Sequence, residues 1–476
     1  MARCGIVLFR IICVLALLAA SVPGFAYSLL THEQIIDLTW DDSIVPLLLS
    51  HYPGLTQAQL DEARAYAYGG CVIQDIGYYP FGQASLSNLT HYVRSGDFVV
   101  ALFRNAHNAD ELAFAVGALS HYVGDSIGHP LATNLGVPIA FPDLKAKYGH
   151  SVNYAEGKVQ HVEVEFAFDV DEETHGRTAP LKYLRKIGMS VSMKQLSLAY
   201  YQTYGVSMDF SGTRKRRVNE DSYRFAVRSF VPDIADAVGI LHKRHMTADV
   251  DTPEARELRS EINAMAAANN WAAYRHPPGL GAHMLAGFIF IMPRFGAFRL
   301  CAIKGPTPQA ESDYVHSVVL SVAAMREMLA RFTPPDKRKA QASDPPAVAD
   351  PGKASEELAK SGRATAVSRT RLDPHHPLPN RDLDTGDVVK PGGYPLTDST
   401  YAYLLHTLTR EPQVPIPQGI KEDIQAYYSN MDAPITTRKH PDQWKQVIAD
   451  LQTLKDMPTS PFPEPYPTYE GEQGQE

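Results

Sequence analysis

Residues 118–130 read Ala-Leu-Ser-His121-Tyr-Val-Gly-Asp125-Ser-Ile-Gly-His129-Pro, with three potential metal ligands at steps of four. On an α-helix such steps return to nearly the same face, drifting by about 40° each time. One helix would therefore direct two imidazoles and a carboxylate into the same space. The neighbouring residues are apolar on most sides, which predicts a buried helix, and a buried unpaired charge is costly. A shared metal ion explains the pattern better than an exposed helix with scattered polar residues.

Length and charge limit the class of protein. The chain has 476 residues, enough for two domains or for one domain with extensions, and its formal net charge is -8. This charge does not suit a protein that binds a nucleic-acid backbone through a basic face, so no stable nucleic-acid partner is expected. Helix formers dominate the middle of the chain without sustained strand alternation, which predicts an all-α fold.

The N-terminus has the pattern of a cleavable secretory signal. Arg3 and Arg10 provide positive charge, residues 11–20 are apolar, and Gly24-Phe-Ala26 is a small-x-small cleavage site. Cleavage after Ala26 would make Tyr27 the first mature residue, in a secreted or periplasmic protein. An uncleaved membrane anchor is the alternative.

Cysteine is not expected to hold a metal. Of four cysteines, Cys4 and Cys13 lie in the signal, which leaves Cys71 and Cys301. Two are too few for a Cys-type zinc site or a disulfide framework, and the sequence does not show whether they pair. The metal ligands should therefore be His, Asp and Glu.

Composition divides the chain into five parts. Residues 1–26 are the signal, and residues 27–335 are predicted to form one multi-helix domain, which includes a helix over 87–105. Residues 336–384 have the Pro-, Ala-, Lys-, Asp- and Ser-rich composition of a disordered linker. A small helical extension (385–457) and a disordered tail (458–476) follow. The apolar run 283–292 is too short to span a membrane; a buried helix or a membrane-contacting patch would explain it.

Further potential ligands surround the opening stretch. Eight of the 18 histidines lie between His32 and His161. His161-Val-Glu-Val-Glu165 repeats the i, i+4 spacing, but His150 competes with His161, and two other glutamates, Glu156 and Glu163, compete with Glu165. Asp75 in a glycine-flanked loop and His91 are single candidates. Spacing alone leaves these alternatives open.

The whole ordered set resembles the zinc-dependent phospholipase C / S1–P1 nuclease superfamily, which is all-helical and holds three zinc ions in one cleft. The resemblance covers roughly residues 27–200 and rests on Tyr27-Ser-Leu-Leu-Thr-His32, Asp75, His91, His121-x3-Asp125, His129 and His161-x3-Glu165. It implies that the α-amine and carbonyl of Tyr27 hold one zinc with His32. It further implies a second zinc on Asp75, His91 and His121, with Asp125 as a bridge between the two, and a third on His129, His161 and Glu165. Asp75 would also be the general base.

Two departures from the family pattern affect the expected substrate. The mature N-terminus is tyrosine rather than the usual tryptophan. His129 follows Asp125 by four residues, where bacterial phospholipases and S1–P1 nucleases have six. The shorter step is more similar to the catalytic domain of glycosylphosphatidylinositol-specific phospholipase D, which favours a lipid substrate.

The expected activity follows from zinc chemistry. Zinc held by imidazoles and carboxylates keeps open positions, lowers the pKa of bound water and stabilises charge on a phosphoryl group. We therefore expect a phospholipase C-like phosphoric ester hydrolase that cleaves phospholipids or other phosphodiesters and contacts a membrane surface. A nuclease of the same fold and a non-catalytic, zinc-stabilised envelope protein are the alternatives. Head-group preference and C-type versus D-type cleavage stay open.

Overall fold

The computed structural model describes residues 29–78, 82–207, 250–275, 305–332 and 377–461, and a few residues between 237 and 287. The expected signal, Tyr27 and Cys301 lie outside the described residues, as does most of the apolar run 283–292. Among the described helices, none has the length and hydropathy of a membrane span.

The described chain is mainly helical and has almost no strands, so the predicted all-α fold is confirmed. The N-terminal domain contains α2 (Leu29–Thr39), α3 (Val45–His51), α4 (Gln57–Gly70), α5 (Ala84–Tyr92), α6 (Ser95–Arg104), α7 (Ala109–Gly128), α8 (Asn134–Ala140), α9 (Pro142–Tyr148), α10 (Lys158–Thr174), α11 (Leu181–Ile187), α12 (Met193–Tyr204), α15 (Pro253–Ala268) and α17 (Pro308–Phe332). Shorter helical turns are η1 (Trp40–Ile44), η2 (Ile73–Gly77), η3 (His129–Thr133) and η5 (Trp271–Ala273). The extension contains α19 (Pro395–Thr409), α20 (Gln418–Tyr427), η7 (Thr436–Lys439) and α21 (Pro441–Asp456). In the extension, two-residue strands β1 (Ile416–Pro417) and β2 (Thr459–Ser460) pair in parallel.

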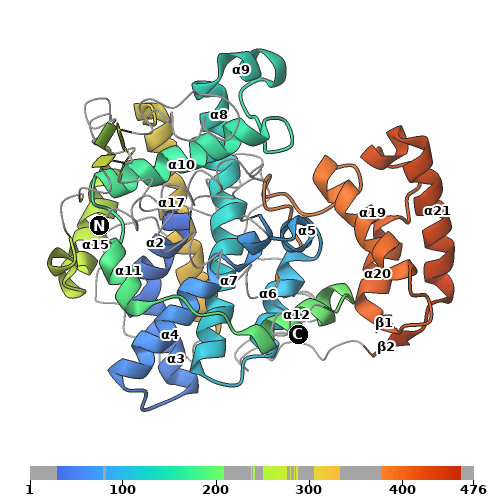
Figure 1. Cartoon of the computed structure of the whole chain (residues 1–476), viewed down its shortest axis with the longest axis horizontal. Coiled ribbons are helices and arrows are strands. Elements are labelled where there is room, and N and C mark those ends of the chain that lie inside the picture. The colour runs from blue at the N-terminus through green and yellow to red at the C-terminus, as the bar shows by residue number, and fades with distance from the viewer. Residues whose placement is uncertain are drawn as a thin grey trace, which may run out of the picture.

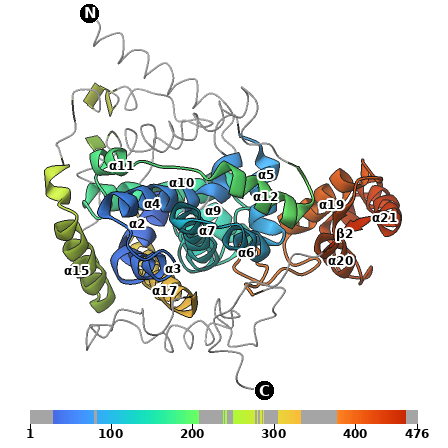
Figure 2. The same ribbon diagram turned by 90° about the horizontal axis from the view of Figure 1, so that it is seen from below.

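Helix α7 is the central element of the N-terminal domain. It packs against α2, α4, α6 and α17, and Figure 2 shows it near the middle of the domain, between α4 and α6. The side chain of Asn108 accepts a hydrogen bond from Glu111 N (2.9 Å), which caps the first turn. At the crossing with α4, a Cβ on Gly117 would lie 2.2 Å from Ala67 O, so glycine permits the close approach of the two helices.

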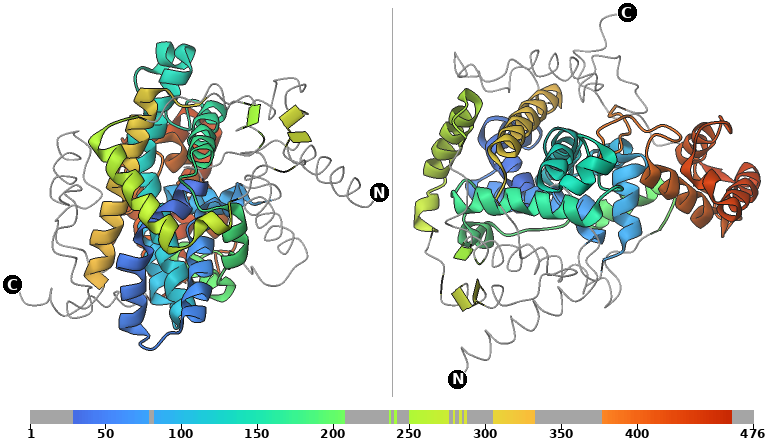
Figure 3. Two further views of the ribbon diagram at one scale, coloured as in Figure 1. Left: turned by 90° about the vertical axis from the view of Figure 1, so that its left-hand side faces the viewer. Right: turned by 90° about the horizontal axis from the view of Figure 1, so that it is seen from above.

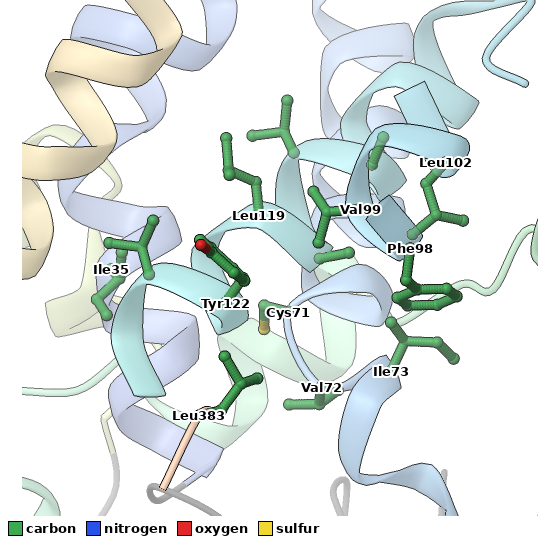
Figure 4. Close-up of a cluster of buried hydrophobic side chains, with 14 of the residues drawn as sticks. Ile35, Cys71, Val72, Ile73, Phe98, Val99, Leu102, Leu119, Tyr122 and Leu383 are labelled. Atoms are coloured by element: carbon green, nitrogen blue, oxygen red, sulfur yellow. The ribbon is translucent and has the colours of Figure 1, made fainter. Parts of the chain in front are cut away.

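Apolar side chains surround the middle of α7. Figure 4 shows its Leu119 and Tyr122 among residues of α2, η2 and α6, such as Ile35 and Val99. Leu383, from far along the chain, belongs to the same cluster and is fully buried. This close packing holds the backbone of α7 in place and thereby positions its polar ligands.

The predicted helix over 87–105 is wrong as a single element. It is broken between α5 and α6 at Arg94, whose φ of 50° lies in the left-handed region. The Arg94 guanidinium donates to Asp97 Oδ2 (2.7 Å) and to Thr203 O (2.9 Å). Thr203 lies on α12, far from Arg94 in the sequence, so local sequence could not predict this hydrogen bond.

The predicted linker is also wrong at its C-terminal end. Residues 377–384 pack against the N-terminal domain, and the most buried of them are Leu378, Arg381, Asp382, Leu383 and Asp384. From there the chain enters the extension, whose α19 contacts α5 and whose α20 contacts α12 (Figure 1). Figure 3 shows the extension, in orange and red, at one end of the molecule.

Candidate metal centre

Six elements bring the predicted ligands together. They are His32 on α2, Asp75 on η2, His91 on α5, His121 and Asp125 on α7, His129 on η3, and His161 and Glu165 on α10. Every one of these side chains is buried. They form three overlapping or adjacent groups in which the potential ligand atoms lie within 4.8 Å of one another. Tyr27 lies outside the described residues.

The first group contains His32, His121 and Asp125. His32 Nε2 lies 3.2 Å from Asp125 Oδ1, and the His32 and His121 rings stack with centroids 4.2 Å apart. A Cβ on Gly124 would lie 3.0 Å from His32 Nδ1, so the glycine on α7 makes room for the ring. Asp169 accepts from Leu30 N (3.1 Å) and therefore holds the start of α2, which carries His32.

The second group contains Asp75, His91 and His121. His91 Nε2 lies 3.3 Å from Asp75 Oδ1 and 3.4 Å from His121 Nε2. Asp125 Oδ2 lies 3.1 Å from His121 Nε2 and 3.4 Å from His91 Nε2, while its Oδ1 faces the first group. Asp125 thus has the orientation that a carboxylate bridging two ions requires.

The third group contains His129, His161 and Glu165. His161 Nε2 lies 2.8 Å from Glu165 Oε1 and 3.0 Å from His129 Nδ1. Of the residues that the sequence left in competition, His150 is exposed and Glu156 accepts a hydrogen bond from Asn153 N (3.0 Å). Both are absent from the three ligand groups, as is the half-buried Glu163.

Backbone carbonyls orient two of the imidazoles. His91 Nδ1 lies 2.7 Å from Ser87 O, and His121 Nδ1 lies 2.9 Å from Cys71 O. With Nδ1–H donating to each carbonyl, Nε2 of each ring faces the centre and offers its lone pair to a metal whenever it carries no proton. Such outer partners are typical of metal-binding histidines.

The donor set fits zinc. Several buried carboxylate oxygens accept no hydrogen bond from the described residues, namely Asp75 Oδ1 and both oxygens of Asp125 and Glu165. Unsatisfied buried oxygens cost free energy, and a bound cation removes this cost. Imidazole and carboxylate donors without thiolate suit zinc in an open, catalytic type of site.

Burial and mutual proximity shift the pKa values of the metal-free centre. Burial opposes the charge on His91, but the neighbouring carboxylates of Asp125 and Asp75 outweigh it and raise the pKa of His91 to about 10. Burial lowers the pKa of His161 to about 4 and raises that of Glu165 well above its usual range. Burial would also raise the pKa of Asp125, but His121 and His129 hold it well below the usual range. Near neutral pH, His161 is therefore an available lone-pair donor, whereas His91 must lose a proton before it binds a metal.

This difference predicts proton release on zinc binding. At pH 8, His91 is protonated in the metal-free protein because its pKa is about 10, so zinc uptake should release about one proton from it. Zinc affinity should accordingly rise with pH until His91 has lost its proton. Calorimetric zinc titration in buffers of different ionisation enthalpy measures the released protons.

Two histidine variants separate the sources of these protons. His91→Ala should release about one proton fewer than the wild type. His161→Ala should remove no released proton, because the pKa of about 4 means that the His161 imidazole carries no proton to lose at pH 8. An equal proton count in wild type and His91→Ala would contradict the assignment.

One residue near the third group was missed by the sequence analysis. Asp384 Oδ1 lies 3.9 Å from His129 Nδ1. Its local signal is only Asp382-Leu-Asp384 in a stretch of linker-like composition. Because Asp384 is far in the sequence from His129, local sequence could not predict this proximity.

Comparison with protein families gives a match in the N-terminal half of the chain. Residues 31–209 match the family model described as zinc dependent phospholipase C. This region contains every predicted ligand that the structure describes. Comparisons with curated proteins and with solved structures give no match.

Proposed function

We propose that the chain is a secreted phosphodiesterase that hydrolyses phospholipids, because residues 31–209 match the family model described as zinc dependent phospholipase C. The observation that carries the proposal is the convergence of three ligand groups, two of which share His121. Such adjacent positions suit the displacement of a phosphate ester, where attacking and leaving oxygens both need stabilisation.

The described residues of the centre would have two roles in hydrolysis, metal binding and removal of a proton from water. When bound, the zinc ions supply Lewis acidity, which makes water acidic near neutral pH and stabilises charge on the phosphoryl oxygens. Asp75 is the general base that we propose, because its buried Oδ1 accepts no hydrogen bond from the described residues. It would take the proton of the attacking water while the other ligands hold their positions. His91 and His121 flank Asp75 Oδ1 at 3.3 and 3.9 Å and keep the carboxylate in place.

Substrate and location complete the proposal. The four-residue step from Asp125 to His129 and the net charge of -8 favour a lipid over a nucleic acid. The N-terminal signal pattern supports export to where such lipids are accessible. Contact of the protein with a lipid surface is part of the same proposal.

Two assays test this function. Zinc-loaded protein purified from its natural secretion route should hydrolyse phosphatidylcholine vesicles and leave single-stranded DNA intact. Release of phosphocholine would identify C-type cleavage, and release of choline D-type cleavage. Cleavage of DNA without lipid hydrolysis would favour the nuclease, and zinc binding without either activity would favour the envelope protein.

A pair of histidine variants links the activity to the centre. His161→Ala removes a buried imidazole of the third group and should lower kcat/KM by about 10²-fold or more, since metals contribute several kcal/mol of transition-state stabilisation. His150→Ala is the matched control, because His150 is exposed and should leave kcat/KM unchanged. A kcat/KM that falls in His150→Ala but not in His161→Ala would show that the third group is not part of the active centre.

A further inference from the structure

Residues 378–394, which we call the strap, contact α5 and α7, which carry predicted metal ligands, and the segments beside η3 and α10, which carry others. We propose that the strap positions these elements, through Asp384 and Tyr394, and so sets the geometry of the metal centre without binding a metal itself. The inference rests on the zinc-binding part of the proposed function. It gives a role to a segment outside the matched region 31–209.

The strap supplies a backbone hydrogen bond to His91. Helix α5 ends at Tyr92, so His91 O lies in the last turn, where carbonyl groups lack a partner within the helix. Leu383 N donates to this oxygen (3.2 Å). The side chain of Leu383 is fully buried and belongs to the apolar cluster drawn in Figure 4. The backbone of a second-group ligand is therefore held by a residue from far along the chain.

Asp384 and Tyr394 join α5 to the loop that precedes α10. Asp384 Oδ2 accepts hydrogen bonds from Tyr92 Oη (3.0 Å) and Tyr394 Oη (2.5 Å). The hydroxyl oxygen of Tyr394 in turn accepts from Ala155 N (3.1 Å). Asp384 and both tyrosines are buried, and a buried polar group that loses its partner costs free energy. This chain of hydrogen bonds therefore fixes α5 relative to the loop.

The other end of this chain reaches the third group. In the loop before α10, the ring of Tyr154 lies edge-on to His161, with the ring centroids 5.5 Å apart. On the neighbouring element, Asn134 Nδ2 donates to Asp384 O (2.8 Å). Asn134 is the first residue of α8 and directly follows η3, which begins at His129. The strap is thus connected to the segments beside both imidazoles of the third group.

Close contact with α7 fixes the path of the strap. Tyr122 Oη donates to Pro379 O (2.7 Å). A Cβ on Gly386 would lie 2.3 Å from Ser126 O, one residue after the predicted bridge Asp125, and this backbone atom cannot rotate away. Gly386 also has a φ of +72°, in the region that favours glycine. The strap therefore lies directly against the helix at the middle of the centre.

Positioning matters because the ligands of each group come from different elements. The second group uses η2, α5 and α7, and the third uses η3 and α10. A functional site needs its groups within about 0.5 Å of their productive positions, held by surrounding packing and hydrogen bonds. Loss of such an outer partner typically weakens metal binding by about 10- to 100-fold. The hydrogen bonds of the strap are outer contacts of this kind.

Tyr394→Phe tests the role of the strap on the full chain. It keeps the buried ring but removes the hydroxyl that joins Asp384 to Ala155. Competition with a coloured chelator should show zinc binding weakened by about tenfold or more. With Co²⁺ in place of zinc, the visible absorption, which reports ligand geometry, should change, whereas a purely structural role would lower Tm and leave this spectrum unchanged. Tyr403→Phe, at an exposed tyrosine of α19, is the matched control and should resemble the wild type.

The outcomes separate this inference from the proposed function. Unchanged zinc affinity and an unchanged Co²⁺ spectrum in Tyr394→Phe would overturn the inference alone, provided that the wild type binds zinc. A wild type that binds no zinc would overturn both. A wild type that binds zinc but hydrolyses no lipid would overturn the proposed function alone, because the zinc affinities of the variants still measure the effect of the strap.

A second variant keeps the test valid if Tyr394→Phe does not fold. Tyr92→Phe removes the other hydroxyl that is bonded to Asp384 and again keeps the ring. It should weaken zinc binding and change the Co²⁺ spectrum in the same way. Equal affinity and an equal spectrum in the wild type and Tyr92→Phe would then overturn the inference.

Discussion

Asp125→Asn should lower hydrolysis by about 10³-fold or more and remove zinc from two positions of the centre. Asp125 Oδ1 faces His32, and Oδ2 faces His91 and His121, so one carboxylate serves two groups. Asparagine has the same shape but no charge and only one oxygen. Loss of about 4 kcal/mol of transition-state stabilisation corresponds to this factor. Zinc content by atomic spectroscopy and kcat/KM on phosphatidylcholine are the two measurements.

A second aspartate on α7 provides the control for this change. Asp110 is half-buried at the start of the same helix, away from the ligand groups, and Asp110→Asn should retain zinc and activity. Full zinc content in Asp125→Asn would show that Asp125 is not a bridge. Loss of activity with full zinc content would point to a role for Asp125 in binding the substrate.

Removal of zinc should destabilise the fold strongly. Without metal, the buried carboxylates of Asp75, Asp125 and Glu165 keep oxygens that accept no hydrogen bond from the described residues. One ion at a free concentration of about a thousand times Kd stabilises the folded state by about 4 kcal/mol. At about 2–4 °C per kcal/mol for domains of 150–250 residues, each lost ion should lower Tm by roughly 10 °C. Thermal unfolding followed by circular dichroism, with and without a chelator, measures the effect.

Metal replacement shows whether the effect is specific. Zinc added after chelation should restore Tm, whereas Mg²⁺ should not, because Mg²⁺ prefers oxygen ligands and this centre is rich in imidazole. A Tm that does not respond to the chelator, although zinc has been removed, would show that the centre makes no net contribution to stability. The protein would then tolerate a cluster of buried carboxylates without a cation.

The sequence alone determined the two helices that carry the predicted ligand pairs. Steps of four residues on one helix are a local property, so His121 and Asp125 had to share a face of α7 and His161 and Glu165 a face of α10. The apolar residues around His121 predicted burial, and the structure buries that helix. The all-α fold and the likeness to zinc-dependent phospholipase C over residues 31–209 followed from the same local patterns and from the order of the motifs.

Only the tertiary structure decided the choices that depend on distant contacts. The packing places His161 in the third group and leaves His150 out of it, because α10 packs beside η3 while His150 is exposed at the surface. It broke the expected helix over 87–105 at Arg94, whose guanidinium bonds to Thr203 on α12. It also brought Asp384 to the third group through hydrogen bonds with Tyr92 and Tyr394.

These differences have a common physical reason. A helix turn relates residues by spacing alone, whereas a contact between distant segments depends on the packing of the whole domain. The set of His121, Asp125 and His129 could therefore be predicted from a single stretch of sequence. Asp384, in a stretch with the composition of a linker, acquires its position only when residues 379–383 bind against α5, α6 and α7.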